Sequence, residues 1–109
     1  MITLILPGYS SNNKTWAQEV AEGLTLEGQI RPIFWEHWDD PTQKFNASEK
    51  ANLLIKHSKG DKINIMAKSI GTLVAAYIIE KIPKQINKVI CFKEEDIIDV
   101  ELINKFFKD

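Results

Sequence analysis

The chain has 109 residues, of which 44% are hydrophobic and 27% are charged, a mixture typical of a globular domain rather than of a disordered or membrane-spanning chain. Fourteen basic and fifteen acidic residues leave a formal net charge of -1, so charge does not favour nucleic acid or an anionic membrane as a partner. We expect one domain over residues 1–109. The apolar run at the N-terminus is too short for a signal sequence or a membrane span, which predicts a cytoplasmic protein.

In the first half of the chain, short apolar runs alternate with segments in which apolar residues recur at helical spacing. Ile2 to Leu6 predicts a short buried strand, which ends at a proline-glycine pair. Apolar residues at four-residue spacing from Trp16 to Leu24 predict a helix that ends near Gly28. A second strand is predicted at Ile30 to Trp35, and a second helix at Ala47 to Ser58.

The second half repeats this alternation. A third strand is predicted at Lys62 to Met66, followed by a helix from Ile70 to Ile82 that is apolar almost all round and therefore central. A fourth strand is predicted at Ile86 to Phe92. The last helix is predicted at Glu95 to Phe107, with the acidic residues 94–96 at its start, where the helix dipole favours negative charge.

Strands that alternate with helices predict an α/β fold: a three-layer sandwich in which a short parallel sheet of about four strands has helices on both faces. Ligands of such sheets bind beyond the carboxyl ends of the strands. Three segments should lie on that edge: Pro7 to Asn13, Glu36 to Asp40, and the turn around Ser69. The lone cysteine, Cys91, lies in an apolar run and is expected to be a small buried side chain.

The turn around Ser69 has the pattern of a nucleophile elbow. Ala67-Lys68-Ser69-Ile70-Gly71 fits G-x-S-x-G with alanine in place of the first glycine, at a predicted strand-to-helix junction. Ala67 and Gly71 are small, as the close passage of strand and helix requires, and the backbone N–H of Ile70 could stabilise an oxyanion. The alternative is that Ser69 simply caps the following helix.

These residues resemble the α/β-hydrolase superfamily, particularly its small, lidless bacterial members. The resemblance rests on AKSIG followed by TLVAAYII, and on LPGYSSNNKTW, in which Gly8 and Trp16 match the family pattern and Pro7 replaces the usual histidine. It implies a strand order of second, first, third, fourth. It also implies an ester or acyl hydrolase in which Ser69 is the nucleophile and Tyr9 supplies a second oxyanion N–H.

The resemblance covers only the N-terminal half of the family's fold, because the acid and the histidine would come from later strands. No histidine follows His57, which should lie near the amino end of the third strand, far from Ser69. His37 is the candidate base. It lies on the correct edge but two strands from Ser69, about 10 Å away, so a loop would have to carry it closer. A longer protein or another chain could otherwise complete the site.

Aromatic residues at the end of the second strand could line an acyl pocket beside Ser69. Trp35 and Trp38 are the principal candidates, although aromatic residues at strand ends also serve as core. The paired carboxylates Asp39 and Asp40 have no His or Cys near them, so we expect turn chemistry rather than a metal site. No motif calls for a cofactor.

Two further hypotheses remain open. The chain could be a non-catalytic binding or oligomerisation module, or the helix after Gly8 to Asn13 could bind a phosphate at its N-terminus. Strand Ile86 to Phe92 would be an apolar sheet edge, which predicts a homo-oligomer formed through it unless the last helix covers it.

Overall fold

Four parallel strands form the centre of the molecule in the computed structural model, which describes all 109 residues. The strands are β1 (Ile2–Leu6), β2 (Gln29–Pro32), β3 (Ile63–Lys68) and β4 (Ile86–Phe92). They lie in the order β2-β1-β3-β4, and all three pairings are parallel. The predicted sheet and its strand order are therefore confirmed.

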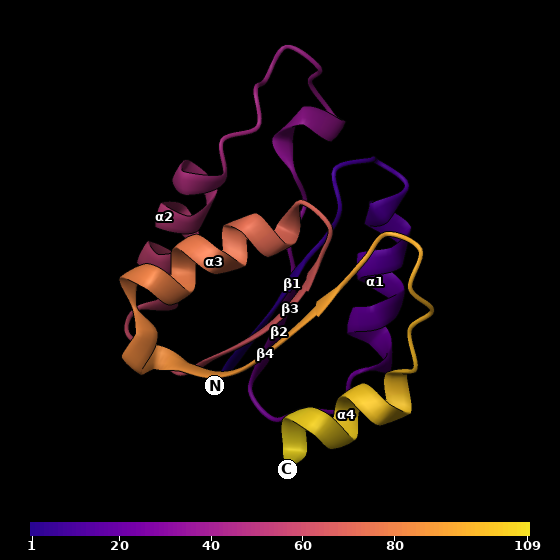
Figure 1. Ribbon diagram of the computed structural model, residues 1–109, viewed down its shortest axis with the longest axis vertical. Coiled ribbons are helices and arrows are strands. Elements are labelled where there is room, and N and C mark those ends of the chain that lie inside the picture. The colour runs from indigo at the N-terminus through magenta and orange to yellow at the C-terminus, as the bar shows by residue number, and fades with distance from the viewer.

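Four helices cover the two faces of the sheet, and the three layers are visible in Figure 1. The helices are α1 (Asn13–Gly23), α2 (Ala47–Ser58), α3 (Gly71–Lys81) and α4 (Val100–Lys108). Helices α2 and α3 pack on one face, whereas α1 and α4 pack on the other. Short 3-10 turns occur at Glu36–Trp38 and Pro83–Gln85. No helix combines the length and the apolar character that a membrane span requires.

The two central strands are buried on both faces, which explains their apolar sequences. Every residue of β1 and β3 is buried. Because successive side chains of a strand point to opposite faces, Leu4 and Ile65 pack against the α2–α3 layer, and Ile5 and Met66 against the α1–α4 layer. The sheet thus divides the core into two apolar clusters.

The prediction that the last helix begins at Glu95 is wrong. Helix α4 begins at Val100, because Asp99 acts as its N-cap and its carboxylate accepts the Leu102 N–H at 3.1 Å. The acidic residues 94–96 instead belong to the loop after β4, where the Asp96 carboxylate accepts the Lys93 N–H at 2.8 Å. The charges that we expected at a helix start therefore lie beside the carboxyl edge of the sheet.

Other boundaries differ by a few residues. Helix α1 ends at Gly23 rather than near Gly28, because Leu24 is already extended. Strand β2 ends at Pro32, and the chain then turns through the 3-10 segment Glu36–Trp38. Strand β3 continues to Lys68, which carries it directly into the turn at Ser69.

The expectation that Cys91 is buried is also wrong. Its side chain is exposed. Strand β4 has a neighbouring strand, β3, on one side only, so its residues lack the two-sided cover that β1 and β3 have. An apolar sequence around a cysteine therefore does not ensure burial at a sheet edge.

The N-terminus is held to the loop before β3 by Asp61, whose carboxylate accepts from the Met1 ammonium group at 3.2 Å. This hydrogen bond lowers the pKa of Asp61 from its ordinary 3.8. A carboxyl group whose pKa is lower in the folded than in the unfolded protein stabilises the fold at pH values above its unfolded pKa. This stabilisation is lost as the pH falls through the pKa of the folded protein.

We predict that Asp61→Asn reduces stability slightly near neutral pH and not in acid, because the pair is solvent-exposed and requires the carboxylate. Urea midpoints of the wild type and the variant should differ at about pH 6, and the difference should shrink progressively as the pH falls below 3.8. Asp39→Asn, at an exposed carboxylate with no hydrogen bond, is the matched control. A difference that stays constant as the pH falls would contradict the prediction.

Candidate functional site

Ser69 occupies a strained turn between β3 and α3. Its φ is 52°, in the left-handed region that non-glycine residues rarely adopt, and its side chain is exposed. Its N–H donates to the Phe92 carbonyl at 2.9 Å, and its carbonyl accepts the Thr72 N–H at 2.9 Å. Backbone bonds on both sides therefore hold this residue in a conformation that turns its side chain to the solvent at the sheet edge.

The small residues of the elbow are required by close packing. A Cβ at Gly71 would overlap the Leu6 carbonyl oxygen and lie 2.9 Å from the Pro7 carbonyl oxygen. Ala67 is fully buried in the cluster beneath α2 and α3. The start of α3 thus passes directly over the end of β1, which brings the elbow beside the loop that follows β1.

The alternative that Ser69 serves as a helix cap has no support in the hydrogen bonding. The side chain of Ser69 makes no hydrogen bond, and α3 begins without a side-chain cap. A capping serine would accept an N–H of the first helical turn. The hydroxyl of Ser69 is therefore free to react or to bind.

Two backbone N–H groups near the elbow are also free. The N–H groups of Tyr9 and Ile70, predicted as oxyanion donors, have no hydrogen-bond acceptor in the chain. Tyr9 belongs to the loop after β1, and Ile70 directly follows the serine. An oxyanion hole needs such unpaired donors, provided that both point to the same oxygen.

Asn13 organises the loop that carries Tyr9, a role that the sequence analysis did not identify. Its side chain is 1% exposed, and its amide oxygen accepts the Gly8 N–H at 3.1 Å. Its amide nitrogen donates to the Ser10 carbonyl and to the Glu94 carboxylate, each at 3.1 Å. An asparagine in a turn cluster before a helix is a recognisable signal, but its partner lies 81 residues away in sequence.

Glu94 extends this network to Lys68, the residue before Ser69. Its carboxylate lies 3.7 Å from the Nζ of Lys68, and that ammonium group also lies 4.6 Å from the centre of the Trp16 ring. Lys68 is buried, so pairing with a carboxylate and an aromatic face offsets part of the cost of its desolvation. The loops after β1, β3 and β4 are thus tied together around Ser69.

His37, the predicted base, contacts the Tyr9 loop. Its Nε2 lies 2.6 Å from the Tyr9 carbonyl oxygen, and its ring stacks on the Tyr9 ring at 4.1 Å. A carbonyl can only accept, so Nε2 carries a proton in this contact, and Nδ1 is then the acceptor of the neutral ring. Nδ1 is buried without a partner, and no hydrogen bond joins His37 to Ser69.

The two tryptophans predicted for an acyl pocket differ in position. Trp35 is 2% exposed and belongs to the core, where its indole N–H donates to the Pro7 and Gly8 carbonyls, each at 3.1 Å. Trp38 is half-buried and donates to the Tyr9 carbonyl at 2.7 Å. Both indoles therefore support the backbone of the loop after β1.

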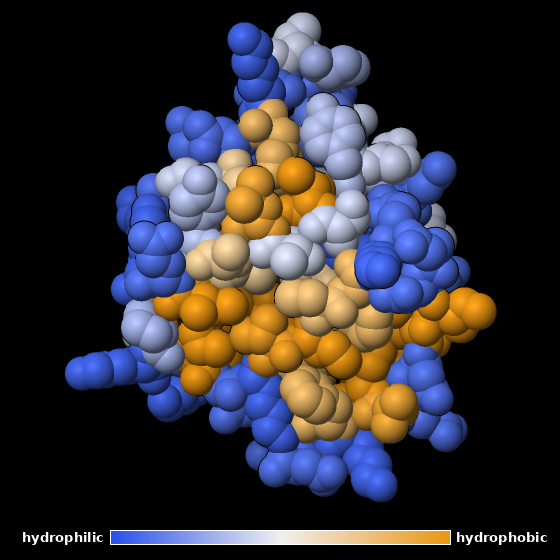
Figure 2. Space-filling view, viewed as in Figure 1, coloured by the Kyte–Doolittle hydropathy of each residue, from blue (hydrophilic) through white to orange (hydrophobic).

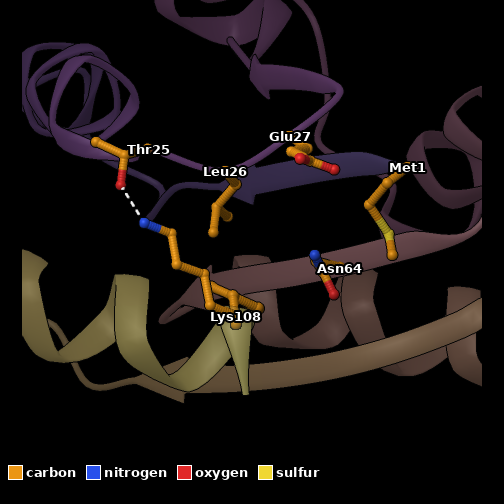
Figure 3. A pocket seen from close by; sticks show the side chains of 7 residues that line it. Met1, Thr25, Leu26, Glu27, Asn64 and Lys108 are labelled. Atoms are coloured by element: carbon orange, nitrogen blue, oxygen red, sulfur yellow. Dashed lines mark hydrogen bonds between the residues drawn. The ribbon is translucent and has the colours of Figure 1, made fainter.

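None of the four cavities of the molecule is lined by Ser69. The largest, about 480 Å³, lies by the N-terminus and the segment before β2, at the amino ends of the strands and away from the elbow. Figure 3 shows Met1, Leu26 and Asn64 around it, with Lys108 of α4 reaching to Thr25, at 2.7 Å. The surface around Ser69 is therefore open rather than enclosed.

The start of α1 is poorly suited to a phosphate. The N–H groups of Asn13 and Lys14 already donate to the Ser10 and Ser11 carbonyls, at 2.9 and 3.1 Å. The Glu94 carboxylate also lies against this turn, where it would repel an anion. The geometry thus offers little to the hypothesis of phosphate binding at this helix.

We predict that Gly71→Ala destabilises the fold, although the same change in an exposed helix would stabilise it by up to about 1 kcal/mol. Overlap of the new Cβ with the end of β1 should cost about 1–3 kcal/mol and outweigh that gain. Urea denaturation measures the free energy of unfolding, and Thr72→Ala, one residue further along the helix, is the control. A Gly71→Ala protein as stable as the wild type would contradict the close passage.

We predict that Asn13→Ala costs about 1–3 kcal/mol, because it leaves the buried Gly8 N–H without an acceptor. The neighbouring Asn12→Ala should cost little, since the Asn12 side chain is exposed and makes no hydrogen bond. Hydrogen exchange of the Gly8 amide should accelerate in the Asn13 variant only. Equal effects of the two substitutions would argue against the network.

Taken together, the elbow offers an unpaired hydroxyl, two unpaired N–H donors in adjacent segments and an open approach for a ligand. These are groups that acyl transfer uses, but the hydroxyl has no base in hydrogen-bond contact. Comparison of the chain with protein-family models and with curated proteins finds no match.

Proposed function

We propose that this protein is a serine hydrolase of α/β-hydrolase type that acts on small esters or related acyl compounds through Ser69. The observation that carries the proposal is the left-handed backbone of Ser69, with φ of 52° and an unbonded side chain, at a strand-to-helix junction. Strained non-glycine residues are uncommon and concentrate at functional sites. The resemblance to the α/β-hydrolase pattern in AKSIG supports the same assignment.

In the proposed reaction the Ser69 oxygen attacks the acyl carbonyl and forms a tetrahedral intermediate. The N–H groups of Ile70 and Tyr9 stabilise its oxyanion. Collapse of the intermediate breaks the ester C–O bond, the alcohol leaves with the proton that the hydroxyl has lost, and water then hydrolyses the acyl-serine. Because no cavity is lined by Ser69, little of the substrate beyond the reacting acyl group would be enclosed.

The step that this chain supports least is removal of the hydroxyl proton. His37 would have to release the Tyr9 carbonyl and turn toward Ser69 to act as the base. Without a base, an oxyanion hole retains only a small part of the rate of a complete triad. We therefore expect slow turnover unless another chain or a further segment supplies an imidazole.

A second candidate function is a non-catalytic binding or assembly module. The observation that favours it is the engagement of His37 with the Tyr9 loop, together with the absence of any hydrogen bond to the Ser69 hydroxyl. In that case the elbow is a structural element of the fold. In either function we propose a cytoplasmic protein whose partners are small molecules or other copies of the chain rather than nucleic acid or membranes.

We predict that a fluorophosphonate probe labels Ser69 if the site is catalytic, because the probe reports an activated serine next to an oxyanion hole. Intact mass spectrometry should show one adduct per chain, which Ser69→Ala abolishes. Ser11→Ala, at an exposed serine in the loop after β1, should label like the wild type.

The extent of labelling separates the two functions. Stoichiometric labelling that depends on Ser69 would support the hydrolase, and its loss in His37→Gln would show that the reaction also requires the imidazole, as a base or as support for the Tyr9 loop. A folded protein that does not react, or that reacts equally in Ser69→Ala, would overturn the hydrolase in favour of the binding module. Circular dichroism of each variant confirms that it is folded.

A further inference from the structure

Strand β4 leaves one hydrogen-bonding edge of the sheet open. It pairs with β3 on one side and with no strand on the other. The Phe92 carbonyl accepts from Ser69 on the β3 side, at 2.9 Å. Since successive residues of a strand direct their backbone groups to opposite sides, the N–H and C=O groups of Val89 and Cys91 point to the open side.

The last helix does not cover this edge. Helix α4 packs over one face of β4, where the Lys88 Nζ donates to the Phe106 carbonyl at 2.7 Å. An apolar hollow of about 340 Å³ remains between them, lined by seven residues: Ile90, Phe92, Ile97, Asp99, Leu102, Ile103 and Phe106. Figure 2 shows a hydrophobic band across the face on which Figure 1 places β4.

Two apolar side chains of α4 lie exposed beside the hollow. Leu102 is 63% exposed and Phe106 is 37% exposed, and Ile97, in the loop before α4, is 96% exposed. An apolar patch that adjoins unpaired strand groups is the usual mark of an interaction surface.

The charges around β4 indicate what occupies the edge. Lys84 lies just before the strand, whereas the segment 93–96 just after it contains one lysine and three carboxylates and is therefore negative overall. A strand of the same sequence added in parallel would bring like charges together. Added in the antiparallel direction, it would bring the basic end of one copy to the acidic end of the other.

We propose that β4 pairs with β4 of a second copy in the antiparallel direction, so that the two sheets form one eight-stranded sheet across a two-fold axis. Full overlap of the strands places Val89 opposite Val89 of the second copy, and it brings the end of one strand that follows Lys84 beside the end of the other that precedes Glu94 and Glu95. The axis is perpendicular to the sheet, so both copies of α4 lie on the same face, and their Leu102 and Phe106 side chains meet there. This inference is independent of any chemistry at Ser69.

The test is sedimentation velocity over a concentration series, with variants at Cys91, where the side chain is exposed and the backbone N–H points outward. Cys91→Pro removes that donor without removing a β3–β4 bond, and Cys91→Lys adds a charge at the edge. Cys91→Ser is the matched control. We expect dimers from the wild type and Cys91→Ser, and at least a tenfold larger dissociation constant for the other two variants, with circular dichroism unchanged.

The antiparallel direction of the two strands is tested separately, through the charges at the ends of β4. Lys84→Glu should weaken the dimer, whereas Lys56→Glu, on the distant helix α2, should not. A wild type that stays monomeric at millimolar concentration would overturn the proposal, and so would a dimer that tolerates both Cys91→Pro and Cys91→Lys. Fast hydrogen exchange of the Val89 and Cys91 amides in a dimer would likewise place the interface elsewhere.

Discussion

The passage of Gly71 over the end of β1 is the contact on which the carboxyl edge of this molecule depends. No side chain fits between the start of α3 and the Leu6 and Pro7 carbonyls, so the helix can approach the sheet only through a glycine. That approach leaves the chain two residues, Ser69 and Ile70, in which to turn from β3 into α3. Ser69 makes this turn in the left-handed region, at a cost that the surrounding backbone bonds offset.

The same edge is held together by polar groups that come from distant parts of the chain. Asn13 joins the loop after β1 to Glu94, and Glu94 lies next to Lys68 of β3. His37 reaches the same loop from the 3-10 segment that follows β2. These contacts give the loop a defined shape around the free N–H of Tyr9, but they also engage the only histidine on this edge. The geometry thus leaves the Ser69 hydroxyl exposed, with no base in hydrogen-bond contact.

Sequence patterns alone determined the order of the elements and the position of the serine. The all-apolar runs of β1 and β3 predict central, doubly buried strands, and the small-x-Ser-x-Gly pattern predicts a turn between a strand and a helix. Both are local signals, because the spacing of apolar residues and the size of a side chain influence the backbone within a few positions of the sequence. They place Ser69, Ile70 and Gly71 correctly without knowledge of any long-range contact.

Only the tertiary structure decided what surrounds that serine. The exposure of Cys91 depends on β4 being an edge strand. The pairing of Asn13 with Glu94 spans 81 residues, and the bond from His37 to Tyr9 spans 28. No local pattern encodes such contacts, because they exist only once the crossover helices have brought the ends of separate strands to one edge. The sequence thus determined where the hydroxyl lies, and the fold decided which groups reach it.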